Sequence, residues 1–118
     1  MTYDMYQSVV DRYVTAFENA DVQIIRDIFA KDAVVEDPVG TEPRRGIEAI
    51  VEFYQQGFAA GAKLVLTQPV RVAGHSVAFA FDVVMGDMKI SPIDVFDFNN
   101  EGRIQHMRAY WGPENMVS

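Results

Sequence analysis

The chain has 118 residues, of which 49% are hydrophobic, and its formal net charge is -7 at pH 7. This charge argues against nucleic acid and anionic membrane surfaces as partners, because both attract basic patches. The absence of cysteine excludes disulfides, thiol nucleophiles and thiolate metal sites. We find no signal-peptide pattern and no apolar run long enough to span a membrane, so a single cytoplasmic domain, residues 1–118, is expected.

The first third of the chain has helical periodicity. Apolar residues recur at helical spacing from Tyr6 to Phe17, which predicts an amphipathic helix. Asp21 can cap a second, shorter helix that extends to Phe29. A third helix is expected over about 46–60, after a loop with the sequence TEPRRG.

Strand patterns occupy most of the remaining chain. A short strand within DAVVEDPVG is expected to end at Asp37, which Pro38 keeps out of the helical region. Further strands are predicted at about 63–72, 75–85, 88–98 and 103–111. Helices first and consecutive strands after them predict an α+β fold, with an antiparallel sheet curled over the helices.

Two aspartates stand out among these patterns. In SPIDVFDF, alternation places Asp94 on the same strand face as Phe96 and Phe98, where ionising a carboxyl group is costly. Such an acid would have a raised pKa and, when neutral, could donate a hydrogen bond. The alternatives are an edge-strand carboxylate that reaches solvent, or a different register. Asp37 is either a turn-capping residue of an Asp-Pro corner or a functional carboxylate.

Two tyrosines lie on the inward faces of predicted helices. By helix geometry alone, Tyr13 is more simply interpreted as a core tyrosine with a satisfied hydroxyl, and Tyr54 is similar. If the two helices pack together, the two hydroxyls could meet. The chain has only two histidines, without metal-ligand spacing, and no glycine-rich phosphate loop. The sequence therefore predicts no metal site.

Five segments together resemble the Δ5-3-ketosteroid isomerases, and the resemblance extends over nearly the whole chain. They are RYV at 12–14, VEDPVGTEPRRG at 35–46, EFY at 52–54, SPIDVFDF at 91–98 and GRIQHMRAYWG at 102–112. VEDPVG and the late ID pair are the specific parts. Many members of the wider nuclear-transport-factor-2-like superfamily share the looser helical segments. The resemblance implies a cone-shaped curved antiparallel sheet wrapped by three helices, a cystatin-like roll with an apolar pocket inside.

The resemblance also implies roles for individual residues. Asp37 matches the general base of these isomerases, and Tyr13 and Asp94 match their two oxyanion-hole donors. Tyr54 matches a tyrosine that hydrogen-bonds the catalytic one, and Phe29 stands where some members carry a third tyrosine. These isomerases are the established example of a carboxylic acid kept protonated by an apolar site. The positions that match the lining of the steroid pocket are Phe53, Phe79, Phe81, Met107 and Trp111.

The expected function is therefore a steroid Δ-isomerase that moves a double bond from Δ5 to Δ4 in 3-ketosteroids. It would need no cofactor or metal, would bind a small steroid, and would form a homodimer as its relatives do. One alternative is another reaction on the same fold, as in polyketide cyclases or epoxide hydrolases. A second is a non-catalytic module for apolar-ligand binding or dimerisation, since fold alone does not determine function.

Overall fold

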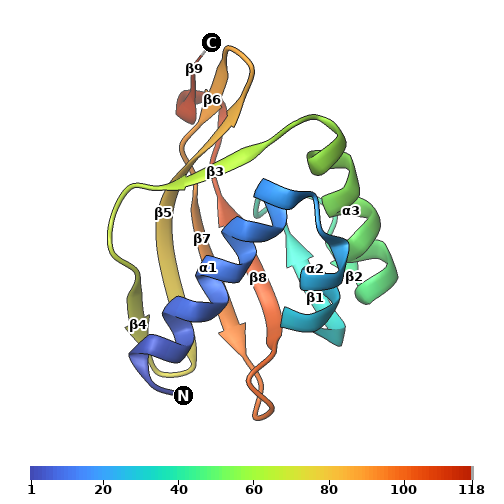
Figure 1. The fold of residues 1–118 in the computed structure, drawn as a ribbon, viewed down its shortest axis with the longest axis vertical. Helices are drawn as coiled ribbons and strands as arrows, with labels where there is room; N and C mark the ends of the chain where they lie inside the picture. Colours follow the sequence, from blue (N-terminus) through green and yellow to red (C-terminus); the bar gives the residue numbers. More distant parts are fainter. Residues whose placement is uncertain (118) are drawn as a thin grey trace.

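The computed structural model describes residues 1–117, which form three α-helices and a strongly curved sheet (Figure 1). The helices are α1 (Tyr3–Asn19), α2 (Val22–Ile28) and α3 (Ile47–Ala59), and Pro113–Asn115 form a short 3₁₀ turn. The strands are β1 (Phe29–Glu36), β2 (Arg44–Arg45), β3 (Lys63–Leu66), β4 (Arg71–Ala73), β5 (Ser76–Met85), β6 (Met88–Ile90), β7 (Ile93–Phe98), β8 (Ile104–Tyr110) and β9 (Met116–Val117). The helices lie together against one face of the sheet.

Local sequence explains where the first two helices begin. The Thr2 side chain accepts a hydrogen bond from the Met5 amide at the start of α1, and Asp21 accepts one from the Gln23 amide at the start of α2. The predicted apolar stripe of α1 is buried against the sheet. Its buried residues are Tyr6, Val10, Tyr13, Ala16 and Phe17.

The strands pair in the order β2-β1-β8-β7-β5-β6-β9, and β3 and β4 also pair with β5. The predicted α+β cone of a curved sheet and three helices is confirmed. The sheet is mixed, because β1 runs parallel to β8 while the other pairs are antiparallel. No hairpin joins β1 to β8, so turn geometry does not impose an antiparallel direction on this pair.

Some predicted boundaries were wrong. The expected strand at 63–72 is divided into β3 and β4, and the one at 88–98 into β6 and β7. Pro69 and Pro92 lie in the two gaps and lack the N–H group that a continuous ladder needs. Phe29 was assigned to the second helix but has extended backbone and begins β1.

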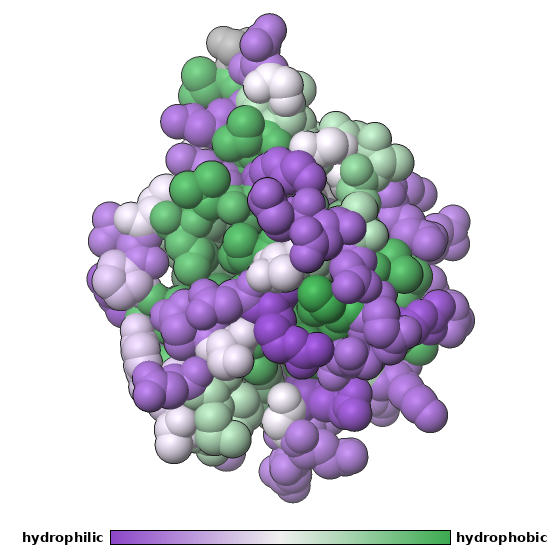
Figure 2. Space-filling view, in the orientation of Figure 1, coloured by the Kyte–Doolittle hydropathy of each residue, from purple (hydrophilic) through white to green (hydrophobic). Residues whose placement is uncertain are grey.

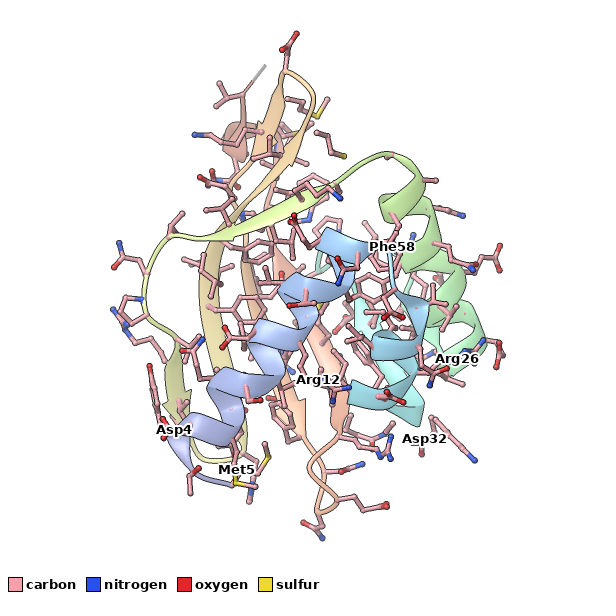
Figure 3. The ribbon with its side chains drawn as sticks, viewed as in Figure 1. Asp4, Met5, Arg12, Arg26, Asp32 and Phe58 are labelled. Carbon is pink, nitrogen blue, oxygen red and sulfur yellow. The ribbon has the colours of Figure 1, made fainter. Side chains whose placement is uncertain are left out.

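Ion pairs connect the helices on the outside of the molecule. Arg12 of α1 lies 3.4 Å from Asp27, and Arg26 of α2 makes a two-pronged contact of 2.9 Å with Glu48 of α3. Figure 3 shows Arg12 and Arg26 at this helical side, and Figure 2 shows polar side chains over much of the same face. Among the helices of residues 1–117, none has the length and apolar character needed to cross a membrane.

Candidate functional site

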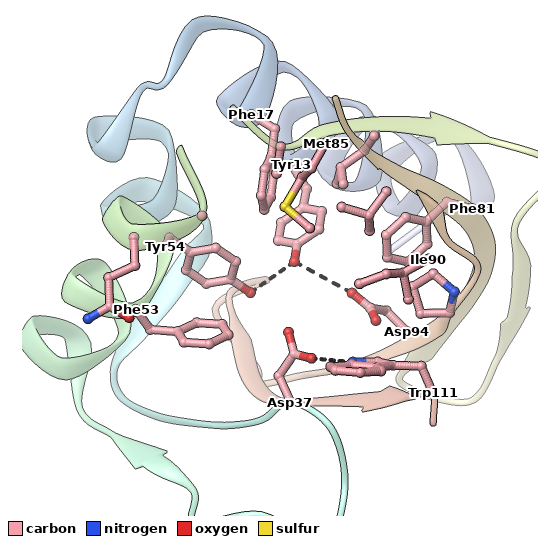
Figure 4. A pocket seen from close by; sticks show the side chains of 16 residues that line it. Tyr13, Phe17, Asp37, Phe53, Tyr54, Phe81, Met85, Ile90, Asp94 and Trp111 are labelled. Carbon is pink, nitrogen blue, oxygen red and sulfur yellow. Dashed lines mark hydrogen bonds between the residues drawn. The ribbon is translucent and has the colours of Figure 1, made fainter. Parts of the chain in front are cut away.

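A cavity of about 350 Å³ opens between the helices and the inner face of the sheet (Figure 4). Its wall is mainly apolar and includes Phe17, Leu64, Phe81, Val83, Met85 and Ile90. The polar side chains on its lining are Tyr13, Asp37, Tyr54, Gln56, Asp94 and Trp111. An apolar cavity with a few convergent polar groups is typical of a small-molecule site.

Tyr13 reaches the cavity from the buried stripe of α1, with a side chain that is 2% exposed. Its hydroxyl lies 3.0 Å from that of Tyr54 on α3 and donates to Oδ2 of Asp94 across 3.5 Å. Burial raises the pKa of Tyr13 well above the ordinary value, and the neighbouring Tyr54, Asp94 and Asp37 reinforce the effect. Tyr13 is therefore a neutral hydroxyl that can donate a hydrogen bond.

Asp94 lies on β7 beside the buried rings of Phe96 and Phe98, and its residue is only 2% exposed. β7 pairs with β5 on one side and β8 on the other, so Asp94 is not the solvent-reaching edge carboxylate of the alternative interpretation. Burial, reinforced by the charge of Asp37, raises its pKa well above the ordinary value, although the Tyr13 hydrogen bond opposes the shift. Its Oδ1 has no hydrogen-bond partner anywhere in residues 1–117.

Asp37 follows β1 and is half-buried at the cavity, facing the Tyr13 and Asp94 side (Figure 4). Its Oδ1 accepts a hydrogen bond of 2.8 Å from the indole N–H of Trp111. Burial raises the pKa of Asp37, while the Trp111 hydrogen bond and the positive charge of Arg44 lower it. Ionised Asp37 is therefore stabilised by both a hydrogen-bond donor and a cation, whereas Asp94 has only the 3.5 Å hydrogen bond from Tyr13 and no cation.

The structure brings the polar ends of Tyr13, Tyr54, Asp37 and Asp94 toward one another on the lining of the cavity (Figure 4). This arrangement can stabilise negative charge on an oxygen through two O–H donors, while a nearby carboxylate accepts or returns a proton. The environments of the two aspartates push their protonation states apart, which is how acid and base roles are divided in such sites.

The five predicted pocket positions fall into two groups. Phe53, Phe81 and Trp111 line the cavity. Phe79 and Met107 do not, because both are buried in the core behind it, with exposed fractions of 2% and 0%. Phe79 supports the wall from behind, because its ring packs 5.2 Å from that of Phe81.

Three features of the site were missed by the sequence analysis. Trp111 was expected only as a pocket wall, whereas its N–H also binds Asp37. Arg44 was placed only in the loop TEPRRG, whereas it belongs to β2 and lies over the ring of Phe53. Gln56 had no signal other than its position two residues after Tyr54. The hydroxyl pair ends at Tyr54, since Phe29 packs against that ring at 5.7 Å and has no hydroxyl.

Within residues 1–117, histidine, aspartate and glutamate side chains form no group of three or more that could hold a metal ion. The two carboxyl groups of the cavity are accompanied by tyrosine hydroxyls and an indole N–H, which are not a typical ligand set for a divalent cation.

The chain is similar to known proteins over most of its length. Residues 10–107 match the family model described as a SnoaL-like domain. The chain is 43% identical over 117 residues to the Steroid Delta-isomerase of Nocardioides simplex, covering 94% of this chain and 93% of that protein. It also superimposes, with a TM-score of 0.86 and 29% identity, on SalBIII, described as an epoxide hydrolase/cyclase-like enzyme in pyran ring formation in the polyether salinomycin. That match covers 93% of this chain and 92% of the other.

Proposed function

The chain belongs to the SnoaL-like domain family, and we propose that it is a steroid Δ-isomerase. The substrate would be a Δ5-3-ketosteroid and the product its conjugated Δ4 isomer. The 43% identity to a steroid Delta-isomerase supports this activity, as does a cavity that is apolar except where the hydroxyl and carboxyl groups gather. A steroid is nearly all hydrocarbon, so the apolar wall suits its ring system.

In the proposed reaction, ionised Asp37 removes a proton from the carbon between the ketone and the double bond. The electrons of that C–H bond move toward the ketone oxygen and form a dienolate. Tyr13 and neutral Asp94 donate hydrogen bonds to this oxyanion. Protonated Asp37 then returns its proton further along the carbon skeleton, and the conjugated enone forms. Product and substrate are isomers, so the reaction balances without a cofactor.

The observation that carries the proposal is that Asp94 is buried with one carboxyl oxygen lacking a hydrogen-bond partner among residues 1–117. A buried carboxyl group with one oxygen lacking a partner is costly for folding, and such groups are uncommon in native proteins. The group becomes useful if a ligand oxygen supplies the missing partner. Neutral Asp94 can then donate a hydrogen bond to that ligand oxygen, beside the hydroxyl of Tyr13. The Tyr13 hydroxyl already lies 3.5 Å from Oδ2, the other carboxyl oxygen of Asp94. We further propose that the enzyme forms a homodimer, as its resemblance implies, and that it acts in the cytoplasm, as the sequence analysis expects.

The test is to add a Δ5-3-ketosteroid and follow the ultraviolet absorption of the conjugated enone. Growth of the band well above the uncatalysed rate is expected for the wild type. Replacing Asp94 by Asn keeps an N–H donor and should be tolerated far better than replacement by Ala. Asp97→Asn is a matched control, because Asp97 lies on the same strand but is paired with Arg108 away from the cavity. Absence of enone formation by the wild type would refute the isomerase proposal.

A second candidate is an epoxide hydrolase or cyclase, favoured by the likeness to SalBIII. The same groups could serve it, with Asp94 or Tyr13 protonating an epoxide oxygen and Asp37 activating water or an internal hydroxyl. A hydroxy-epoxide substrate separates the two functions. Conversion of that compound without any isomerisation of the ketosteroid would favour the second candidate.

A further inference from the structure

Arg44 lies beside the cavity without lining it. It belongs to β2, where it pairs with Val35 of β1 shortly before that strand reaches Asp37. Its guanidinium carbon lies 4.3 Å from the centre of the Phe53 ring, a geometry typical of a cation–π contact. One guanidinium nitrogen also donates to the backbone carbonyl of Asp37 across 3.5 Å. Arg44 therefore contacts both the segment that carries Asp37 and the helix that carries Phe53.

These contacts bear on two groups that face the cavity. Phe53 forms part of the cavity wall, so Arg44 supports that wall from behind. The segment after Asp37 is fixed to β8 by the Val39 amide, which donates to the Ala109 carbonyl at 2.9 Å. Arg44 attaches the same segment to α3, on the other side of the cavity.

We propose that Arg44 is a positioning residue for the isomerase reaction: its guanidinium holds the Asp37 backbone against the Phe53 wall and keeps a positive charge beside the base. This inference rests on the proposed function for its catalytic meaning. The contacts themselves do not depend on which substrate enters the cavity.

The charges around Asp37 explain why a single cation matters. The titratable groups that face it from the packed elements are Tyr13 of α1, Tyr54 of α3 and Asp94 of β7, all kept neutral by burial. Trp111 contributes a neutral N–H donor. Within residues 1–117, the cation that offsets the effect of burial on the pKa of Asp37 is Arg44. Removing it should therefore move that pKa upward and leave less of the base ionised at a given pH.

Arg45 provides a matched control. It is the next residue on the same two-residue strand and pairs with Val34, so its side chain points to the opposite face. Arg45 is exposed, whereas Arg44 is partly buried. Removing one positive charge at either position is an equal change in net charge. If the contacts of Arg44 set the pKa of Asp37, only the change at Arg44 should move that pKa.

The experiment compares Arg44→Met, Arg44→Lys and Arg45→Met with the wild type. Carbon-13 NMR of the resting protein follows the Asp37 carboxyl, assigned by its loss in Asp37→Asn, and kcat/KM is measured across pH. Arg44→Met should move the acid-side midpoint to higher pH in both measurements, because the base is protonated more easily. The midpoint of Arg44→Lys should remain closer to that of the wild type, and the midpoint of Arg45→Met should equal that of the wild type. If Arg44→Met does not fold, Arg44→Gln replaces it in the same comparison.

An Arg44→Met midpoint equal to the wild type, or an equal displacement in Arg45→Met, would overturn the role given to Arg44. The NMR titration needs no turnover, so it separates this inference from the proposed function. The titration of Asp37 could be displaced in Arg44→Met while neither the wild type nor any variant isomerises a ketosteroid. That result would reject the isomerase proposal and retain Arg44 as the residue that sets the ionisation of Asp37.

Discussion

The burial of Asp94 predicts an unusual dependence of stability on pH. Above about pH 3.9, the ordinary pKa of aspartate, Asp94 ionises in the unfolded chain. In the folded protein its pKa is raised well above that value, by burial first and by the charge of Asp37 second. The folded state then holds a proton that the unfolded state has lost, so Asp94 makes the protein less stable as pH rises through this window.

The size of the effect follows from this difference of one proton. While Asp94 is neutral in the folded protein and ionised in the unfolded one, the free energy of unfolding falls by about 1.4 kcal/mol for each pH unit. Asp94→Asn removes this titration at similar side-chain volume. The free energy of unfolding of Asp94→Asn minus that of the wild type should therefore rise with pH, by up to about 2.7 kcal/mol between pH 5 and 7.

The measurement is urea denaturation of both proteins at several pH values between 5 and 8, using the slope of the difference with pH. Any constant effect of the buried amide cancels in that slope. Asp97→Asn is the control and should show no slope between pH 5 and 8, because Asp97 is ionised there in both the folded and the unfolded state. Burial alone would raise the pKa of Asp97, but the hydrogen bonds from Ser76 and Arg108 outweigh it and lower the pKa. Its stabilising effect is therefore lost only as pH falls below about 3.9, outside the range of this measurement.

A difference between Asp94→Asn and wild type that stays constant from pH 5 to pH 8 would refute the reasoning. It would mean that Asp94 titrates alike in the folded and unfolded states. The oxyanion-donor role would then lose its physical basis, because an ionised carboxylate has no proton to donate.

Three further predictions concern turnover, each measured by the enone absorbance assay. Tyr13→Phe should lower kcat by about a hundred- to a thousand-fold, since one donor to the oxyanion is lost; Tyr6→Phe, on the same helix with its hydroxyl bonded to the Gly74 carbonyl, should change kcat little. Asp37→Asn should nearly abolish turnover but still bind a planar phenolic steroid, whereas Glu36→Gln should retain activity because Glu36 pairs with His106 on the outer sheet face. Asp94→Ala should lower kcat far more than Asp94→Asn, and equal losses in the two would indicate that Asp94 acts as an anion.

The local pattern of apolar and polar residues was sufficient to predict which way several side chains of the site point. The spacing of apolar residues in α1 predicted that Tyr13 points inward, and strand alternation placed Asp94 with Phe96 and Phe98 rather than with Asp97. These properties depend on backbone periods that every helix and strand shares, so they can be read from neighbouring residues alone. Proline marked the end of the segment that carries Asp37, but the divisions at Pro69 and Pro92 were overlooked in longer apolar runs.

The contacts that turn these residues into one site are properties of the tertiary structure. Tyr13 contacts Tyr54, 41 residues away in the sequence, and Asp94, 81 residues away. Trp111 contacts Asp37, from which it is separated by 74 positions. No local period specifies such pairs. They arise because α1 and α3 pack on the same concave face and because β7 pairs with β8 in a register that sets Asp94 opposite Ala109. The position of Arg44 over Phe53 has the same origin, since β2 must pair with β1 before its side chains acquire definite faces. The sequence by itself determined which side chains point inward, and only the packed sheet and helices decided which of them touch.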